Sequence, residues 1–113
     1  MSVQEIIGPA SSYYVSQRLK LHFVDWGNDD KPPLLLIHGG KDHARSWDWV
    51  ARALRRDFHV IVPDLRGHGD TDAPPGPYTV DQLADDAAHL LDQLGLPGPI
   101  IVGGLSMGGY IAL

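Results

Sequence analysis

Three short, almost entirely apolar runs constrain the fold of this chain more than any other feature of its sequence. They occupy Pro33–Ile37, residues 59–62 and residues 99–102. A strand that is apolar on both faces is typical of the centre of a parallel sheet, where helices cover each side. Segments with helical patterns separate the three runs. This alternation predicts an α/β fold with a mostly parallel sheet and crossover helices.

The segments between the runs predict two helices. Residues 79–94 give the clearest one, because apolar side chains recur at helical spacing along one face. Thr79 with Gln82 three residues later predicts a capping box at its start, and Gly95 predicts its end. A second helix is expected over residues 46–54, with Ser46 as its N-cap.

Two more strands are expected before the first apolar run, over residues 13–16 and 19–24. The second alternates apolar residues with polar Lys20 and His22, which is typical of a strand with one buried face. A chain of 113 residues is long enough for one small domain, and it contains no internal repeat or low-complexity tract. We therefore expect residues 1–113 to belong to a single domain.

Composition argues against several classes of protein. The net charge of −5 disfavours a nucleic-acid partner, because binding phosphates needs a basic surface. Cysteine is absent, so disulfides and thiolate metal ligands are excluded, and we expect neither a metal site nor a cofactor. The N-terminus lacks the features of a signal peptide, and no apolar run approaches the roughly 20 residues that cross a bilayer. We expect a cytoplasmic protein without a membrane partner.

The third apolar run leads directly into Gly104-Leu105-Ser106-Met107-Gly108, a G-x-S-x-G pattern. In this pattern the serine lies on a sharp strand-to-helix turn, which needs small residues two positions before and after it. The turn lifts the serine hydroxyl above the sheet, and the next helix points its unpaired N–H groups at it. Those groups can stabilise a developing oxyanion. We predict Ser106 as a catalytic nucleophile.

A second glycine-rich turn, His38-Gly39-Gly40-Lys41, follows the first apolar run. Its backbone can present an N–H group toward Ser106 as a further oxyanion donor. Gly40 is our choice for this donor, with Lys41 as the alternative. We expect His38 to brace the loop through hydrogen bonds rather than to act as a base, because a buried histidine needs partners.

The segment Asp64-Leu65-Arg66-Gly67-His68-Gly69 follows the second apolar run. Its acidic and basic side chains can hold the loop through charge-assisted hydrogen bonds, while its glycines allow the chain to turn. Direct contact with a substrate is the other interpretation of this segment. We interpret Asp64 and Arg66 as scaffold.

Together these features resemble the N-terminal part of the α/β-hydrolase superfamily, from residue 12 to residue 113. The resemblance rests on the turn at His38, on Trp47, and on residues 63–69 and 104–109. It implies the sheet order 1-2-4-3-5. It also implies an oxyanion hole built from the backbone N–H groups of Met107 and of a residue in the Gly40 turn.

The resemblance also narrows the chemistry. Haloalkane dehalogenases and epoxide hydrolases of this superfamily carry an aspartate as nucleophile, so a serine there speaks against both. Ser106 favours a serine hydrolase acting on a small ester, lactone or related acyl substrate. Two alternatives remain: a non-catalytic, ligand-binding module of the same fold, and an acyltransferase or perhydrolase that uses the same serine.

A serine nucleophile needs a histidine base and an acid, and in this fold both follow the serine along the chain. Only seven residues follow Ser106, and none of them is acidic or histidine. We therefore expect the sequence to be truncated within the helix after the serine. A missing C-terminal part of the protein would supply both groups, and the chain alone is predicted to be inactive.

Overall fold

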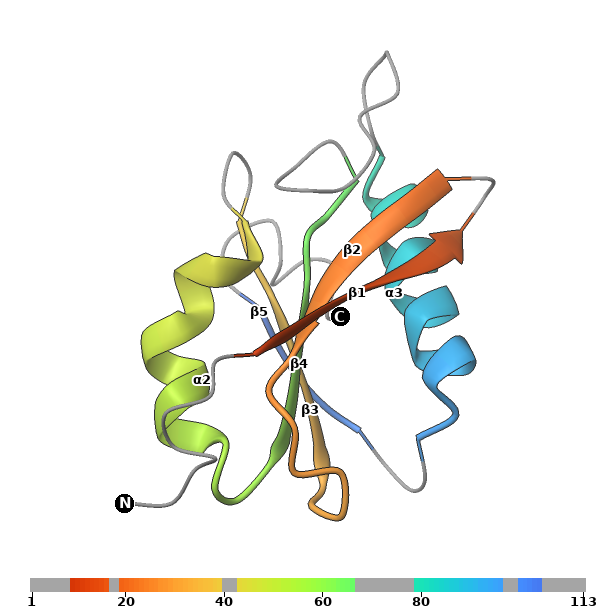
Figure 1. Cartoon of the computed structure of the whole chain (residues 1–113). Helices are drawn as coiled ribbons and strands as arrows, with labels where there is room; N and C mark the ends of the chain where they lie inside the picture. Colours follow the sequence, from red (N-terminus) through yellow and green to blue (C-terminus); the bar gives the residue numbers. More distant parts are fainter. Residues whose placement is uncertain (1–8, 17–18, 40–42, 67–78, 97–99, 105–113) are drawn as a thin grey trace.

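The computed structural model describes residues 9–16, 19–39, 43–66, 79–96 and 100–104. A five-stranded sheet of order β1-β2-β4-β3-β5 forms its centre, as the resemblance implied (Figure 1). The strands are β1 (Ala10–Ser16), β2 (Leu19–Asp25), β3 (Pro33–Ile37), β4 (His59–Pro63) and β5 (Ile101–Gly104). β3 runs parallel to β4 and β5, whereas β2 runs antiparallel to β1 and β4. The described sheet is therefore mixed, because an N-terminal hairpin adds two antiparallel pairings.

One expectation for β2 is wrong. The alternation over residues 19–24 predicted that His22 would share an exposed face with Lys20, yet His22 is only 3% exposed. Its ring packs against the ring of Tyr13, with centroids 5.2 Å apart, and Nδ1 lies 2.6 Å from the carboxylate of Asp64. A polar residue can occupy a buried position of a strand when it has a partner there, and for Nδ1 of His22 that partner is Asp64.

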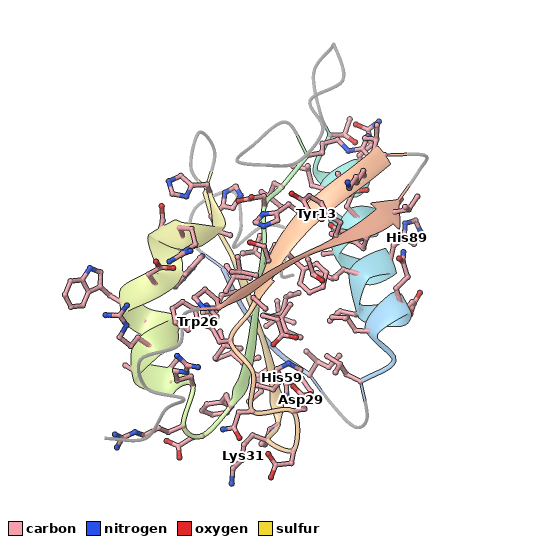
Figure 2. All side chains as sticks on the ribbon, viewed as in Figure 1. Tyr13, Trp26, Asp29, Lys31, His59 and His89 are labelled. Carbon is pink, nitrogen blue, oxygen red and sulfur yellow. The ribbon has the colours of Figure 1, made fainter. Side chains whose placement is uncertain are left out.

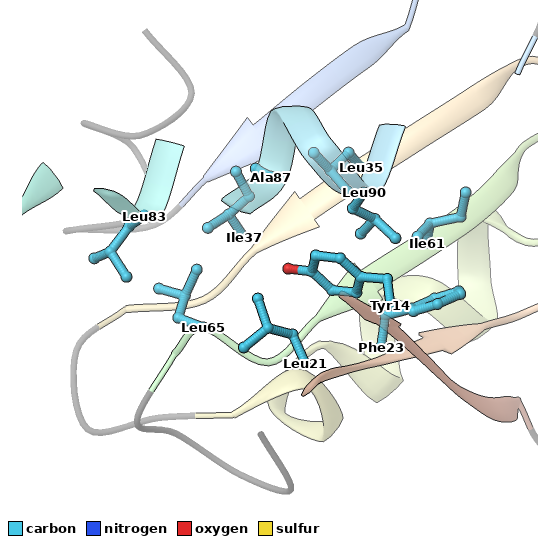
Figure 3. Packing of buried hydrophobic residues seen from close by; sticks show 10 residues of the cluster. All are labelled: Tyr14, Leu21, Phe23, Leu35, Ile37, Ile61, Leu65, Leu83, Ala87 and Leu90. Carbon is cyan, nitrogen blue, oxygen red and sulfur yellow. The ribbon is translucent and has the colours of Figure 1, made fainter. Parts of the chain in front are cut away.

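β3 and β4 are buried at every position, as their apolar sequences predicted. The helix α2 (Asp48–Leu54) covers one face of the sheet and α3 (Val80–Leu94) covers the other (Figure 1). Alternate residues of β3 belong to two separate core clusters, one on each face. Figure 3 shows the cluster under α3, in which Leu35 and Ile37 of β3 meet Leu83 and Leu90 of the helix.

The two helices begin differently. Thr79 caps α3 with a complete capping box: its Oγ1 accepts from the Gln82 N–H at 3.1 Å, and the Gln82 side chain accepts from the Thr79 N–H at 3.0 Å. Gly95 ends the helix in a left-handed conformation with φ of 59°. Both features confirm the sequence prediction, since each depends only on local residues.

The prediction that Ser46 caps the second helix is wrong. A 3₁₀ turn over Ala44–Trp47 precedes α2, and the N-cap is Trp47, without a side-chain cap hydrogen bond. The N–H of Ala44 donates to Asp64 Oδ1, so the helical turn begins two residues before Ser46. A contact distant in sequence thus sets where this helix starts. None of the helices in the described ranges is long and apolar enough to cross a membrane.

Candidate active site

The segments expected to carry the chemistry leave the sheet at one edge. His38 follows β3 and Asp64 follows β4, at the carboxyl ends of neighbouring parallel strands. Gly104 ends β5 and pairs in parallel register with Ile37, the last residue of β3. Open α/β sheets bind ligands at this edge. The residues that precede the two glycine-rich turns are therefore direct neighbours.

The three residues predicted to act on the substrate, Gly40, Ser106 and Met107, lie outside the described residues, as does the alternative donor Lys41. Their roles stay predictions. The described part of β5 shows a close approach at Gly103, one residue before the G-x-S-x-G pattern. A Cβ atom on Gly103 would lie 3.2 Å from Cδ2 of Leu36 on the neighbouring strand, so Leu36 would have to shift by a few tenths of an ångström to admit a side chain there.

His38 braces the loop, as the sequence predicted. It is 1% exposed, and its Nε2 lies 2.9 Å from the Leu65 N–H. A backbone N–H can only donate, so Nε2 accepts and the ring proton is on Nδ1. Nδ1 lies 2.6 Å from the carbonyl oxygen of Gly39, which accepts that proton. Both ring nitrogens are thus engaged by the backbone, one on each of two loops, and this histidine is not placed to take a proton from a substrate.

Asp64 contacts the chain on the far side of the glycine-rich turn that begins at His38. Its carboxylate is buried, with Oδ1 accepting from the Ala44 N–H at 2.6 Å and Oδ2 lying 2.6 Å from His22 Nδ1. The described residues His38 and Ala44, one on each side of this turn, are therefore both hydrogen-bonded to residues just after β4. We call His22, His38 and Asp64, with their backbone partners, the loop clamp. The sequence predicted a scaffold role for Asp64 but gave no signal for His22.

Arg66 continues this segment into a second buried network. Its guanidinium donates two hydrogen bonds to Asp86 of α3, from Nε to Oδ2 at 2.8 Å and from Nη2 to Oδ1 at 2.9 Å. Both side chains are at most 6% exposed. Bidentate pairs of this kind fix orientation as well as distance. Arg66 thus serves as scaffold, as predicted, although its carboxylate partner is on α3 rather than in its own loop.

Tyr14 borders this network from β1. Burial, followed by the negative charge of Asp86, raises the pKa of its phenol well above the usual value. The phenol therefore stays protonated at any physiological pH.

A serine, a histidine and an aspartate also meet at α3, but they do not form a catalytic triad. Ser16 Oγ lies 2.6 Å from Asp86 Oδ1 and 2.6 Å from His89 Nδ1. A hydroxyl has a single proton, which goes to the carboxylate, so His89 must donate to the serine oxygen. The serine is also only 2% exposed. The group joins β1 to α3, and its histidine donates to the serine oxygen instead of accepting the hydroxyl proton.

Comparison with known proteins agrees with this arrangement. The family model described as "alpha/beta hydrolase fold" matches residues 32–113. The chain therefore belongs to the α/β-hydrolase family.

Individual relatives cover several hydrolytic chemistries. Human epoxide hydrolase 4 is 38% identical over 96 residues, which are 83% of this chain and 26% of that protein. The 3-oxoadipate enol-lactonase 2 of Acinetobacter baylyi is 34% identical over 83% of this chain and 35% of its own length. The crystal structure of a bacterial membrane phospholipase A superimposes with a TM-score of 0.86 at 32% identity, covering 93% of this chain and 34% of that one. The chain thus spans about a third or less of these proteins.

Proposed function

We propose that the protein is a serine hydrolase that acts on a small carboxylic ester, lactone or related acyl substrate. The observation that carries this proposal is the pairing of Ile37 with Gly104. It makes the stems of the two glycine-rich turns neighbours at the carboxyl edge of the sheet. A nucleophile on one turn and an oxyanion donor on the other then come from adjacent strands, as acyl transfer requires.

In the proposed reaction, the Ser106 hydroxyl attacks the substrate carbonyl carbon, and the backbone N–H groups of Met107 and Gly40 stabilise the oxyanion that forms. A histidine, which we expect beyond residue 113, takes the serine proton and passes it to the leaving group, while an acid orients that histidine and stabilises its charged form. Water then hydrolyses the acyl-enzyme and restores the serine. The loop clamp contributes by holding both ends of the segment that contains Gly40.

The identity of the nucleophile separates this function from that of the human relative, which is named an epoxide hydrolase. An aspartate that opens an epoxide forms an ester, which water can cleave. A serine that opened an epoxide would form an ether, which water cannot cleave under the same conditions, so the enzyme would stop after one turnover. Ser106 therefore favours acyl substrates, in line with the relatives named as a lactonase and a phospholipase.

The test uses the full-length protein, offered p-nitrophenyl butyrate, a γ-lactone and styrene oxide. We expect turnover of the ester or lactone, and covalent labelling of Ser106 by a fluorophosphonate. Ser106→Ala should lower kcat by at least about 10³-fold and abolish labelling. The control is Ser12→Ala, which removes an exposed serine and should leave both unchanged.

Three results would count against the proposal. Absence of labelling together with ligand binding would indicate the non-catalytic module. Sustained turnover of styrene oxide that survives Ser106→Ala would indicate another nucleophile. Transfer of the acyl group to an added alcohol in preference to water would indicate an acyltransferase. The cytoplasmic location, the small-molecule partner and the inactivity of residues 1–113 alone also stay predictions.

A further inference from the structure

Three side chains able to ligate a metal ion meet at the edge of the sheet opposite the candidate active site. Asp25 ends β2, Asp29 lies in the turn before β3, and His59 begins β4. One ligand atom from each lies within 4.8 Å of the other two. Figure 2 shows Asp29 and His59 side by side at the end of the molecule where β4 starts. We call these three residues the turn cluster.

The distances in the turn cluster approach those of a metal site. His59 Nε2 lies 2.8 Å from Asp25 Oδ1 and 3.5 Å from Asp29 Oδ1. Zinc bonds of about 2.0–2.1 Å in tetrahedral geometry separate ligand atoms by roughly 3.3 Å. Both contacts are within about 0.5 Å of that separation. The ligand atoms of Asp25 and Asp29 lie within 4.8 Å of each other, so an ion would draw the two carboxylates together, mainly by rotation of Asp29, which projects into solvent.

The three side chains of the turn cluster differ in their exposure to solvent. The side chain of His59 is 5% exposed, that of Asp25 is 27% exposed and that of Asp29 is 86% exposed. A buried imidazole thus forms the base of the cluster and a carboxylate forms its mouth, which leaves room for an ion to enter and to keep water ligands. Asp25 is itself oriented, because its Oδ1 accepts from the Gly27 N–H at 2.8 Å.

Charge favours a cation in the same place. Two carboxylates surround one imidazole, so the cluster is negative whether the ring is neutral or protonated. The Asp25 carboxylate accepts from Nε2, which therefore carries the proton when no metal is present. Nδ1 of His59 is also buried and has no hydrogen-bond partner among the described residues. When a divalent ion binds Nε2, the single ring proton moves to Nδ1, and the ion offsets both carboxylate charges.

We propose that Asp25, Asp29 and His59 bind a zinc ion, with water completing its coordination. An imidazole with two carboxylates suits zinc, whereas calcium and magnesium prefer sites made of oxygen ligands. The ion would tie the turn between β2 and β3 to the start of β4. It would take no part in the reaction at Ser106, because the five residues of β4 separate the two edges by about 13 Å. The proposal stands whether or not the proposed function is correct.

The surroundings of His59 limit the affinity of the turn cluster for zinc. A zinc-bound histidine usually donates its second ring N–H to a carboxylate or carbonyl, and loss of such a partner weakens binding about 10–100-fold. Nδ1 of His59 has no such acceptor among the described residues. We therefore expect reversible zinc binding rather than a permanently loaded site.

The experiment uses untagged full-length protein treated with a chelator, because a histidine tag would bind zinc itself. Zinc binding is measured by competition with a chromophoric chelator and by the shift in Tm. We expect one zinc ion in the turn cluster. At ten times the Kd, zinc should stabilise the full-length protein by about 1.4 kcal/mol and raise its Tm by about 3 °C. Asp29→Asn is the key variant, because its side chain is exposed and its loss should not disturb folding.

Asp30→Asn is the matched control, since Asp30 is the exposed neighbour in the same turn and lies outside the cluster. Asp29→Asn should weaken zinc binding at least tenfold and remove the Tm shift, whereas Asp30→Asn should bind zinc like the natural protein. His59→Gln should also lose the ion. Equal zinc affinity in the natural protein and Asp29→Asn would overturn the proposal, as would the absence of a zinc-dependent Tm shift in the natural protein.

Discussion

The two ends of the parallel strands, which we call the carboxyl edge and the amino edge of the sheet, differ in how their polar side chains are buried. At the carboxyl edge, the loop clamp and the Arg66–Asp86 pair are almost fully buried, and their hydrogen bonds reach backbone and side chains on several elements. At the amino edge, the turn cluster has one buried member, and its carboxylates open toward solvent. A buried polar network fixes the geometry of its members, but any member that loses its partner in the low-dielectric interior destabilises the protein strongly. An exposed polar group can instead bond to water when its partner is replaced. The comparison therefore predicts that substitutions at the carboxyl edge are far more costly.

The largest effect is expected at the Arg66–Asp86 pair. Asp86→Asn leaves the buried guanidinium facing a neutral amide, and breaking a buried pair in this way costs about 3–5 kcal/mol. Asp85→Asn, the exposed neighbour on the same helix, should change the free energy of unfolding by less than about 0.5 kcal/mol. Urea unfolding of the full-length protein measures both. Equal costs for the two variants would show that the pair does not fix the position of Arg66.

The next largest effect is expected in the loop clamp, where two variants of Asp64 distinguish its contact with Ala44 from its contact with His22. Asp64→Ala removes the acceptors for the Ala44 N–H and for His22, while Asp64→Asn keeps an oxygen for Ala44 and loses the charge beside His22. Hydrogen bonds to charged groups contribute about 1.5–3 kcal/mol each. Asp64→Ala should therefore destabilise the protein by about 3 kcal/mol or more, and Asp64→Asn by about half as much.

The same pair of variants reports on catalysis under the proposed function. A shift of the turn that contains Gly40 misplaces the oxyanion donor, and a displacement of about 1 Å can cost roughly 100-fold in rate. Asp64→Ala should thus lower kcat at least tenfold with a smaller change in KM. The exposed Asp57→Asn serves as the control for the charge change. If kcat is unchanged while stability falls, the clamp supports the fold without positioning the donor.

The sequence predicted what local patterns encode. The apolar strands β3 and β4 and the capping box of α3 follow from neighbouring residues. The bracing role of His38 was also predicted, although its partner Leu65 is distant along the chain, because a buried histidine needs hydrogen-bond partners wherever they come from. The sheet order followed from the resemblance to the family. The burial of His22 and the start of α2 did not follow, because each depends on Asp64, 42 and 20 residues away respectively.

The turn cluster escaped sequence analysis for a related reason. Zinc patterns are recognised by ligands at short, regular spacing, whereas Asp29 and His59 are 30 residues apart and meet because β4 pairs with both β2 and β3. The hydrogen bond from the Trp26 N–H to the Val60 carbonyl, at 3.0 Å, brings the end of β2 close to the start of β4. Pairing between strands thus supplies the contacts that spacing along the chain does not.

The smallest effect is expected at the amino edge when no metal is present. Asp29→Asn should change the free energy of unfolding by less than about 0.5 kcal/mol in chelator, because its carboxylate is exposed and its contact with His59 is a long one of 3.5 Å. Urea unfolding with and without zinc separates the intrinsic effect from the effect of the ion. A cost above about 1 kcal/mol in chelator would mean that Asp29 already stabilises the turn without a metal, since exposed ion pairs contribute less than this. The two edges would then differ less in their tolerance of substitution than their burial predicts.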